Sequence, residues 1–371
     1  MVLMLLACTD ETADTGQPMV GDTSCETAPY FLDQDGDGLG IGDPEYRCEP
    51  GEGFTGTNDD DCWDTDPEIG AEGLFLITSV TEEFTEQASG DEPFVHTIEE
   101  AATLVVCGGS YSIAFQVDAA LAVRGVGEAS LRAQGQRLFT ATAPLSVTRV
   151  DLLDGFSTED GGAIFSTSDV TLTDLRVANA SALSGGAVYQ TGADGSLTLD
   201  GVTMEDNQAT ADGGAAVVEG DLTVTDSIFL RNTAVNGGAF HLGIGTSSFT
   251  GSALSENTAD RGGALDLRPL HHATVTDSQL TQNVGSFGGA FATWETARLD
   301  CVDSAIHSNT ADTRGGGAWL LPTEGATSLT SSGCDWGDGD TDNFRDDVYN
   351  TQTAYVGTAG DWTCVGVTCS L

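Results

Sequence analysis

Residues 229–240 read Phe-Leu-Arg-Asn-Thr-Ala-Val-Asn-Gly-Gly-Ala-Phe, and close variants of this stretch recur along the chain. Self-similarity at a period of this length indicates a solenoid, in which each repeat packs on the next. The Gly-Gly-Ala triplet begins, at intervals of 24 to 28 residues, at Gly161, Gly185, Gly213, Gly237, Gly262, Gly288 and Gly316. An Asn precedes most triplets by five to seven residues, at Asn179, Asn207, Asn232, Asn257, Asn283 and Asn309.

Alignment on the Asn reveals three apolar columns, one for each short strand expected in a repeat. Eight residues before the Asn lie Leu199, Val224, Phe249, Val275 and Cys301; three before it lie Met204, Phe229, Leu254, Leu280 and Ile306; directly after the triplet lie Ile164, Val188, Ala216, Phe240, Leu265, Phe291 and Trp319. Three strands per repeat predict an all-β fold, a right-handed parallel β-helix of about ten turns. We expect the Gly pairs to form tight turns and the Asn column to form a hydrogen-bonded ladder.

The repeat resembles those of chlamydial polymorphic outer membrane proteins, on the evidence of Phe229 to Asn232 followed by Gly237 to Ala239. The general build resembles the pectate-lyase-like superfamily. That resemblance implies either a polysaccharide lyase, with a Lys or Arg base and calcium-binding carboxylates, or a glycosidase. The Asn-Thr-Asp and Gly-His-Gly motifs of the hydrolases are absent, and there is no Lys. Because fold alone does not license an activity, a non-catalytic scaffold is the preferred reading.

The strand after each triplet should also present an outward column, which reads Phe165, Tyr189, Val217, His241, Asp266, Ala292 and Leu320. Two residues further on lie Glu219, Arg268 and Trp294. Tyr189, Glu219 and Trp294 are the candidate glycan contacts, because aromatic and polar side chains on a strand face suit a sugar chain. Asp266, Arg268 and His241 are the catalytic candidates if the protein is an enzyme. The alternative is a mixed, solvated face.

The charge of the chain excludes several functions. Its 371 residues carry 12 Lys+Arg against 58 Asp+Glu, a formal net charge of -46, and every basic residue is Arg. Nucleic acid is excluded as a partner because phosphate neutralisation needs basic residues. An anionic membrane surface would repel the chain. Schiff-base and Walker-type chemistry both need the missing Lys.

An acidic segment, residues 28–73, is predicted to bind calcium. Asp33, Asp35 and Asp37 are followed by Gly38, and the carbonyl of Leu39 would be the next ligand of a calcium loop. The closing Glu is missing, so a second cluster would complete the shell: Asp59, Asp61, Asp64 and Asp66. The segment resembles short extracellular Asp/Cys metal-binding repeats through Tyr30, Asp33 to Gly38, Cys48, Pro50, Gly53, Phe54, Asp61, Cys62, Asp64 and Pro67, and departs from them at Trp63. The alternative is a solvated acidic linker.

The N-terminus resembles a bacterial lipobox, Leu5-Leu6-Ala7-Cys8, which implies lipidation of Cys8; the alternative is a chance Cys. We therefore expect a signal remnant (1–8), a polar tether (9–27), the calcium module (28–73), the β-helix (74–333) and a C-terminal cap (334–371). Eight further Cys favour disulfides, and spacing favours Cys48–Cys62 and Cys364–Cys369. Two further candidate cation sites are His271-His272, and Asp338, Asp340 and Asp342 in the cap.

These observations predict an outer-membrane lipoprotein of a Gram-negative bacterium, displayed in the cell envelope or outside the cell. We expect a monomer that touches the membrane only through its lipid anchor. Its predicted role is that of a calcium-binding, non-catalytic scaffold for adhesion or polysaccharide binding, and its predicted partner is a polysaccharide or surface glycan. The alternative is a secreted, calcium-dependent polysaccharide lyase or glycosidase.

Overall fold

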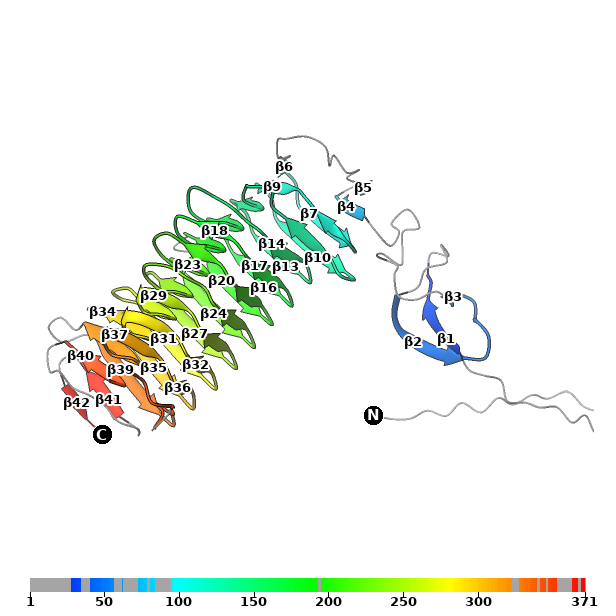
Figure 1. Cartoon of the computed structure of the whole chain (residues 1–371). Helices are drawn as coiled ribbons and strands as arrows, with labels where there is room; N and C mark the ends of the chain where they lie inside the picture. The colour runs from blue at the N-terminus through cyan, green and yellow to red at the C-terminus, as the bar shows by residue number, and fades with distance from the viewer. Residues whose placement is uncertain are drawn as a thin grey trace, which may run out of the picture.

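A computed structural model describes residues 28–34, 41–56, 62, 73–78, 81–83, 95–192, 195–321, 327–338, 341–344, 346–351, 362–365 and 368–370. No α-helix is present among these residues, so the described chain is all-β, as predicted. Most of it forms one parallel β-solenoid, in which successive strands stack into a rod (Figure 1). The described residues accordingly contain no helix that could span a membrane.

Three long sheets run along the rod, one for each strand position of the repeat, as the three apolar columns predicted. Sheet I has 14 strands: β5 (Thr81–Glu83), β4 (Gly73–Ile77), β7 (Ala102–Cys107), β10 (Leu121–Val126), β13 (Leu145–Thr148), β16 (Val170–Thr173), β20 (Ser196–Asp200), β24 (Asp221–Thr225), β27 (Thr246–Thr250), β31 (His272–Thr276), β35 (Arg298–Val302), β39 (Ser328–Ser332), β41 (Trp362–Val365) and β42 (Thr368–Ser370).

Sheets II and III form the other two sides of the rod. Sheet II has 9 strands: β8 (Ser110–Tyr111), β11 (Ser130–Arg132), β14 (Asp151–Leu153), β17 (Arg176–Ala178), β21 (Thr203–Glu205), β25 (Ile228–Leu230), β28 (Ala253–Ser255), β32 (Gln279–Thr281) and β36 (Ala305–His307). Sheet III has 11 strands: β6 (Val95–Ile98), β9 (Ala114–Val117), β12 (Phe139–Ala141), β15 (Ile164–Ser166), β19 (Val188–Gln190), β23 (Ala216–Val218), β26 (Phe240–Leu242), β30 (Leu265–Leu267), β34 (Phe291–Trp294), β38 (Ala318–Leu321) and β40 (Val348–Asn350).

Smaller sheets complete the structure. Two lie in the turns that lead into sheet III: β18 (Ser181–Ala182) with β22 (Gln208–Ala209), and β29 (Thr258–Arg261) with β33 (Val284–Phe287) and β37 (Thr310–Arg314). Near the N-terminus, β1 (Ala28–Leu32) pairs antiparallel with both β2 (Ile41–Arg47) and β3 (Phe54–Thr55).

The solenoid has about eight turns, fewer than the ten expected from the repeat length. The reason lies at its ends, where strands add to sheet I without closing a turn. Strand β4 pairs antiparallel with β5 and β7, and β41 pairs antiparallel with β39 and β42. Sequence periodicity counts residues, whereas a turn requires all three strands of a rung.

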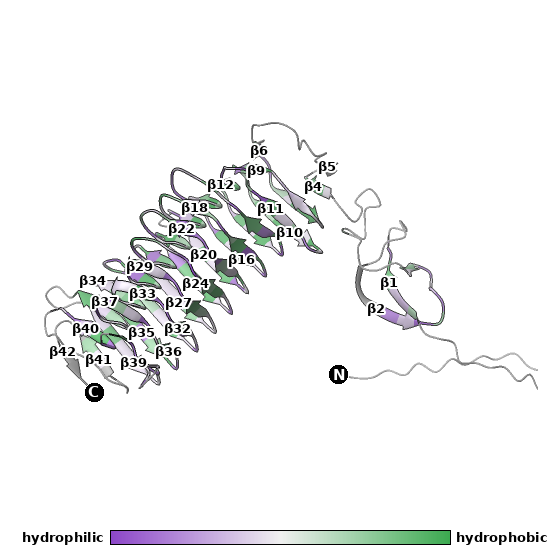
Figure 2. Ribbon diagram, in the orientation of Figure 1, coloured by the Kyte–Doolittle hydropathy of each residue, from purple (hydrophilic) through white to green (hydrophobic). Residues whose placement is uncertain are grey.

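The core is the continuous stack of inward side chains, visible as hydrophobic strand positions along the rod in Figure 2. Phe229 lies on β25, Phe240 on β26 and Phe249 on β27, so each of the three sheets contributes one ring. None of the three side chains has exposed surface. The Phe240 ring lies edge-to-face with both others, at centroid distances of 4.6 and 5.4 Å. One rung cannot bury its apolar side alone, so stacking supplies most of the stability.

The last repeat is shifted by one residue from the predicted alignment. Phe291 pairs with Ala318, and Ala292 pairs with Trp319. The inward residue is therefore Ala318, and the placement of Trp319 inside the core was wrong. The left-handed turn residue is Gly315 (φ 68°), so the repeat reads from Gly315 and not from Gly316. Three consecutive glycines made the two alignments indistinguishable in sequence.

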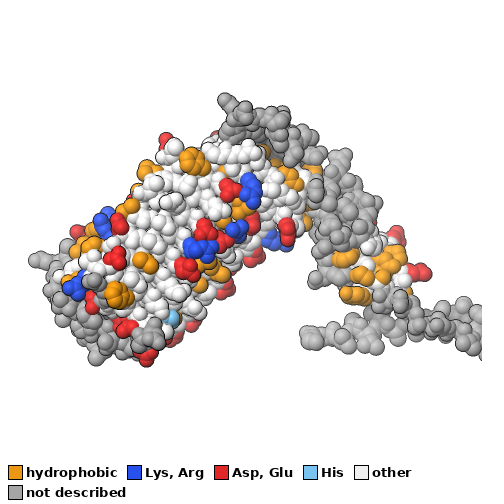
Figure 3. All heavy atoms as spheres, viewed as in Figure 1, with side chains coloured by type: hydrophobic (Ala, Val, Ile, Leu, Met, Phe, Trp, Pro, Cys, Tyr) orange, Lys and Arg blue, Asp and Glu red, His pale blue; other side chains and the backbone are white. Residues whose placement is uncertain are grey.

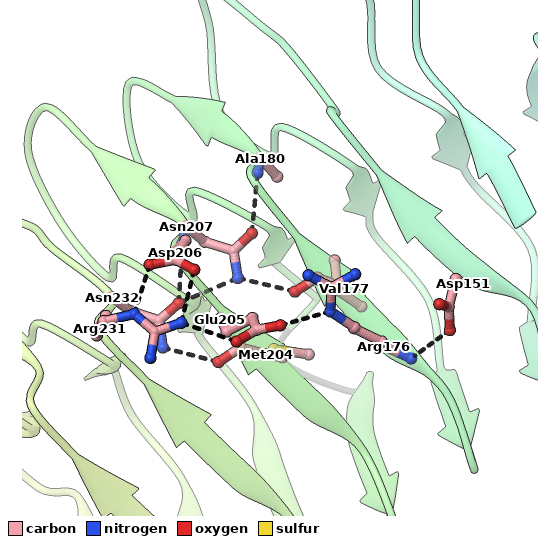
Figure 4. Close-up of polar contacts among 10 residues, drawn as sticks. All are labelled: Asp151, Arg176, Val177, Ala180, Met204, Glu205, Asp206, Asn207, Arg231 and Asn232. Atoms are coloured by element: carbon pink, nitrogen blue, oxygen red, sulfur yellow. Dashed lines mark hydrogen bonds and ion pairs between the residues drawn. The ribbon is translucent and has the colours of Figure 1, made fainter.

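The Asn column forms the predicted ladder (Figure 4). Asn232 Nδ2 donates to Oδ1 of Asn257 at 3.0 Å and to the carbonyl of Met204 at 3.0 Å, and its backbone N–H donates to the same Oδ1 at 2.9 Å. The same pattern continues through Asn283 and Asn309 and extends to Asn343. Each buried amide thereby satisfies backbone groups of the neighbouring rungs.

Two details of the ladder differ from expectation. Asn179 is exposed and lies outside the ladder, because Ala180 occupies the position equivalent to Asn207 and its N–H donates to Asn207 Oδ1. From Asn207 to Asn309 the left-handed conformation belongs to the residue before the ladder Asn, for example Asp206 (φ 56°) and Arg231 (φ 54°). The ladder position therefore requires the hydrogen-bonding amide of Asn and does not require tolerance of positive φ.

Each Gly pair has two separate tasks. Gly237 adopts φ 64°, which favours glycine. A Cβ on Gly238 would lie only 2.1 Å from the carbonyl oxygen of Gly263 in the next rung. The second Gly is thus required by the close approach of neighbouring turns.

The disulfides correct one predicted pair. Cys62 bonds to Cys107 at the end of β7, not to Cys48, and Cys301 bonds to Cys334. Cys62 packs with Phe75, Val105 and Cys107, so the acidic segment is fastened to the first turns of the solenoid. Cys48 and Cys364 are also disulfide-bonded, and Cys364 lies directly opposite Cys369 between β41 and β42.

Candidate functional site

The outer positions of sheet III place the predicted site residues side by side. Strands β19, β23, β26, β30 and β34 are neighbours, and their registers align the outward residues Tyr189, Val217, His241, Asp266 and Ala292. After the shift in the last repeat, Trp319 continues this column in place of Leu320, which is buried in the core.

Most of this column is buried, unlike the flat exposed face expected from the sequence, and at His241 it forms the floor of a groove. His241 is 8% exposed and Asp266 is 0% exposed. One wall comes from the residues that directly precede the Gly pairs. Parallel backbone β-bridges join Asp212 to Asn236 and Asn236 to Arg261. The opposite wall follows the ends of β23, β26 and β30.

The groove opens between these walls and has a volume of about 510 Å³. Its lining comprises Asp212 and Asn236 on one wall, His241 on the floor, and Glu219, Gly243, Ile244, Arg268, Pro269 and Leu270 on the other wall. Ile244 and Leu270 are 63% and 65% exposed, so they form an apolar rim above a polar floor.

His241 and Asp266 form a close pair at the base of the groove. Nδ1 of His241 lies 2.9 Å from Oδ2 of Asp266 and 3.9 Å from Oδ1 of Asp212. The first distance is short, but the two groups are not aligned for a hydrogen bond, and both atoms are buried without a hydrogen-bond partner. Burial of an unsatisfied polar pair is costly, so this arrangement calls for a functional explanation.

Trp294 contacts Asp266 and the groove residue Arg268. Its Nε1 donates to Oδ1 of Asp266 at 2.7 Å. The guanidinium carbons of Arg261 and Arg268 lie 4.7 and 4.9 Å from its ring centroid, so one Arg from each wall contacts the indole. This cover explains why Asp266 has no exposed surface. It also commits Arg268 to a cation–π contact as well as to the groove lining.

Glu219 depends on a glycine for its position. A Cβ on Gly243 would lie 2.2 Å from Oε2 of Glu219, so the missing side chain leaves room for the carboxylate. The carbonyl of Gly243 also lies 2.9 Å from Nδ1 of the buried His271. Glu219 is thus held beside His241 at the mouth of the groove.

Tyr189 lies on the floor two strands before His241. Its ring stacks on Phe165 at 5.8 Å with an interplanar angle of 12°. Burial raises the pKa of the Tyr189 hydroxyl, and the negative charges of Asp160, Glu219 and Asp212 raise it further. The phenol therefore stays protonated and can donate a hydrogen bond at neutral pH.

Sequence reasoning missed one wall of the groove. Asp212 and Asn236 lie outside the named strands and Arg261 ends β29, and the apolar periodicity of the repeat marks none of them. A signal was present, since each immediately precedes a Gly pair and neighbouring turns stack in register. The rim residues Ile244 and Leu270 lie outside the strands, and nothing in the repeat identifies them.

The structure describes only some of the residues predicted to bind metal. Asp33 follows β1, and its N–H donates to the carbonyl of Gly53 at 2.9 Å. The other proposed ligands lie outside the described residues, as does Cys8: Asp35, Asp37, Leu39, Asp59, Asp61, Asp64 and Asp66. Asp340 also lies outside them, and within the described chain no three His, Cys, Asp or Glu side chains converge on a metal position.

His271 and His272 do not form a shared site. His271 is buried, with Nδ1 2.9 Å from the carbonyl of Gly243 and Nε2 3.0 Å from Oγ of Ser247. His272 begins β31 and places Nε2 2.8 Å from Oδ2 of Asp300. Burial lowers the pKa of His271 to about 4, so this imidazole is neutral at pH 7. Its two ring nitrogens are engaged within the protein.

The fold defines the chain as a parallel β-solenoid protein with an outer groove on one sheet. Comparison with known proteins adds no narrower class: no protein-family profile, no curated protein and no solved structure matches this sequence.

Proposed function

We propose that the groove on sheet III binds a carbohydrate chain and that the protein is a non-catalytic binding scaffold. The observation that carries this proposal is the pairing of a polar floor with an apolar rim in a groove of about 510 Å³. Sugars present hydroxyls at their edges and C–H groups on their faces, so both kinds of surface are needed. His241, Glu219 and Asp212 would meet the hydroxyls, and Ile244 and Leu270 would meet the C–H faces.

Charge favours a neutral glycan. Among the lining residues the carboxylates of Asp212 and Glu219 outnumber the single guanidinium of Arg268. A polyuronate would meet like charge there, and the chain as a whole carries a formal net charge of -46. The groove therefore differs in expected ligand from a site built for pectate.

A glycan array with neutral, amino-sugar and uronate oligosaccharides, followed by calorimetry on the best ligand, tests this proposal. Glu219→Gln should weaken binding of that ligand. Glu256→Gln, an exposed acid in a turn far along the rung from the groove, is the matched control and should leave binding unchanged. Absence of binding to every glycan, or equal weakening by both variants, would sink the proposal.

A second candidate is a carbohydrate-cleaving enzyme, and the His241–Asp266 pair favours it. A buried carboxylate 2.9 Å from an imidazole can hold the ring in one orientation, as a general base requires. The test is release of reducing ends or unsaturated products from a polysaccharide panel with calcium. Turnover that disappears in His241→Ala, Asp266→Ala or Arg268→Ala would replace the scaffold proposal with this one.

The remaining parts of the proposal concern location. We infer that the protein is a secreted lipoprotein, anchored through Cys8 to the outer membrane of a Gram-negative bacterium. Residues 28–73 would form a calcium-binding stalk, and the solenoid would act like those of polymorphic outer membrane proteins or of the pectate-lyase-like superfamily. Supporting residues are the lipobox-like Leu5 to Cys8 and the paired Asp clusters.

Two measurements test location and calcium. A clickable fatty acid should label the full-length precursor at Cys8, and a Cys8→Ser variant should stay unlabelled. Calorimetry should detect calcium binding that weakens in Asp35→Asn. If chelation leaves the melting temperature unchanged and no heat of binding is seen, the acidic segment is a solvated linker.

A further inference from the structure

The outer face of sheet I carries an ordered array of hydroxyl side chains. Six adjacent strands, β13, β16, β20, β24, β27 and β31, present two outward columns in register. The first column is Ser146, Thr171, Thr198, Thr223, Ser248 and Thr274. The second is Thr148, Thr173, Asp200, Thr225, Thr250 and Thr276. We call these positions the hydroxyl array.

The composition of the hydroxyl array contrasts with that of the chain. Asp200 is its single charged member, although 58 of the 371 residues are acidic. On β10 the equivalent positions are Ala122 and Arg124, and on β35 they are Asp300 and Val302. The array therefore has defined ends. Charged and hydrophobic side chains leave much of the side of the rod visible in Figure 3 to backbone and to other side chains.

The hydroxyls are accessible. Every member of the array is half-buried or exposed. Among the residues that the structure describes, none of the eleven hydroxyls in the two columns takes part in a hydrogen bond with protein. The polar residues of the core and turns, by contrast, are bonded in ladders such as the one from Ser227 to Ser252. The array therefore bonds to whatever lies outside the protein.

The solenoid gives the hydroxyl array a fixed two-dimensional period. Neighbouring parallel strands are about 4.8 Å apart, and residues two apart along a strand are about 6.6 Å apart. The pairing of β13, β16, β20, β24, β27 and β31 continues without a bulge, so the period is kept over six rungs. Apolar residues fill the inner positions of the same strands, which holds the backbone of the array rigid.

We propose that the hydroxyl array binds ice. A rigid lattice of hydroxyls and Thr methyl groups, with Asp200 as its single charged member, can hold a layer of water at repeats comparable to those of oxygen atoms on a prism face of ice. Charged side chains would order water around themselves instead, and the array nearly lacks them. A crystalline polysaccharide is the competing flat partner, but its recognition relies on aromatic stacking, and no aromatic side chain lies in the array. This proposal is independent of the groove on sheet III.

The test is thermal hysteresis and inhibition of ice recrystallisation by the purified protein. The wild type should show both, and Thr223→Lys, at the centre of the array, should lose both. Thr281→Lys, an outward Thr on β32 of sheet II, is the matched control and should keep them. Circular dichroism and melting curves would confirm that both variants fold.

Three outcomes overturn the proposal. The first is a folded wild type without ice activity at any concentration. The second is equal loss in Thr223→Lys and Thr281→Lys. The third is an array-dependent pull-down on crystalline chitin or cellulose without ice activity, which would assign the array to a solid glycan.

Discussion

Trp294 Nε1 donates a 2.7 Å hydrogen bond to Oδ1 of Asp266, across the 28 residues that separate neighbouring rungs. Asp266 has no exposed surface, so this indole is the donor that makes its burial tolerable. The contact links Asp266 to Arg261 and Arg268, whose guanidinium groups lie against the indole ring.

Trp294→Phe should destabilise the protein. The substitution keeps an aromatic ring between Arg261 and Arg268 but removes the only hydrogen-bond donor to Asp266 within the described chain. A cost of about 1–3 kcal/mol is expected for leaving a buried acceptor unpaired. Urea unfolding measures it. The double variant with Asp266→Asn should recover part of the loss, because a neutral amide is cheaper to bury; an additive double variant would contradict this account.

Asn257→Ala should also destabilise strongly, because it interrupts the ladder. Asn257 has no exposed surface, and it accepts from Asn232 and donates to the carbonyl of Phe229 and to Asn283. We expect a loss of about 2–3 kcal/mol or more, since several buried groups lose partners. Asn179→Gly is the control: Asn179 is exposed with φ 57°, a conformation glycine accepts. Equal effects of the two variants on the melting temperature would argue against a ladder.

Two glycines separate stability from binding. Gly238→Ala should cost about 1–3 kcal/mol or prevent folding, because the new Cβ meets backbone of the next rung, at 2.1 Å from the Gly263 oxygen. Gly243→Ala should fold with a smaller loss, since its two closest contacts are the flexible end of Glu219 and its backbone contact, with the Glu219 Cα, is at 3.2 Å. It should nevertheless weaken glycan binding by displacing that carboxylate. Melting curves and calorimetry on both variants distinguish the two effects.

Asp347 should make stability depend on pH. Burial raises the pKa of this carboxyl from 3.8 to about 7; the Asn343 amide opposes the rise, and Asp342 and Asp346 add to it. The folded state therefore holds a proton that the unfolded state releases above pH 3.8. The stabilisation is fully present below about pH 3.8 and is lost as the pH rises through about 7.

Asp347→Asn isolates this effect. The difference in unfolding free energy between variant and wild type should grow between pH 4 and pH 7 and level off above, measured by urea titration at several pH values. His271, whose pKa is lowered to about 4, has the opposite sign: its contribution is lost as the pH falls from 6.5 towards 4. The His271 contribution is the same in the wild type and in Asp347→Asn, so it cancels in the difference between their unfolding free energies. A pH-independent difference would show that Asp347 is ionised in the fold.

The sequence by itself determined the repeat and therefore the architecture. A Gly pair and an Asn recurring every 24 to 28 residues, with three apolar positions between them, admit few folds other than a three-sheet parallel solenoid. The outward column of sheet III was readable for the same reason, because strands alternate their side chains with period two. Tyr189, His241 and Asp266 were placed on one column correctly in this way.

Only the tertiary structure decided the features that depend on contacts between rungs. A shift of one residue decides whether Asn179 or Ala180 faces the ladder. A shift of the same size decides whether Ala318 or Trp319 faces the core, and periodicity resolves neither. Burial of Asp266 depends on Trp294 at the end of β34, which belongs to the next repeat. Cys62 bonds to Cys107 and not to Cys48, which is nearer in sequence, because β7 lies beside it in space. A repeating sequence specifies the structure of one repeat. The strand register and the burial of individual side chains are fixed by how the repeats stack.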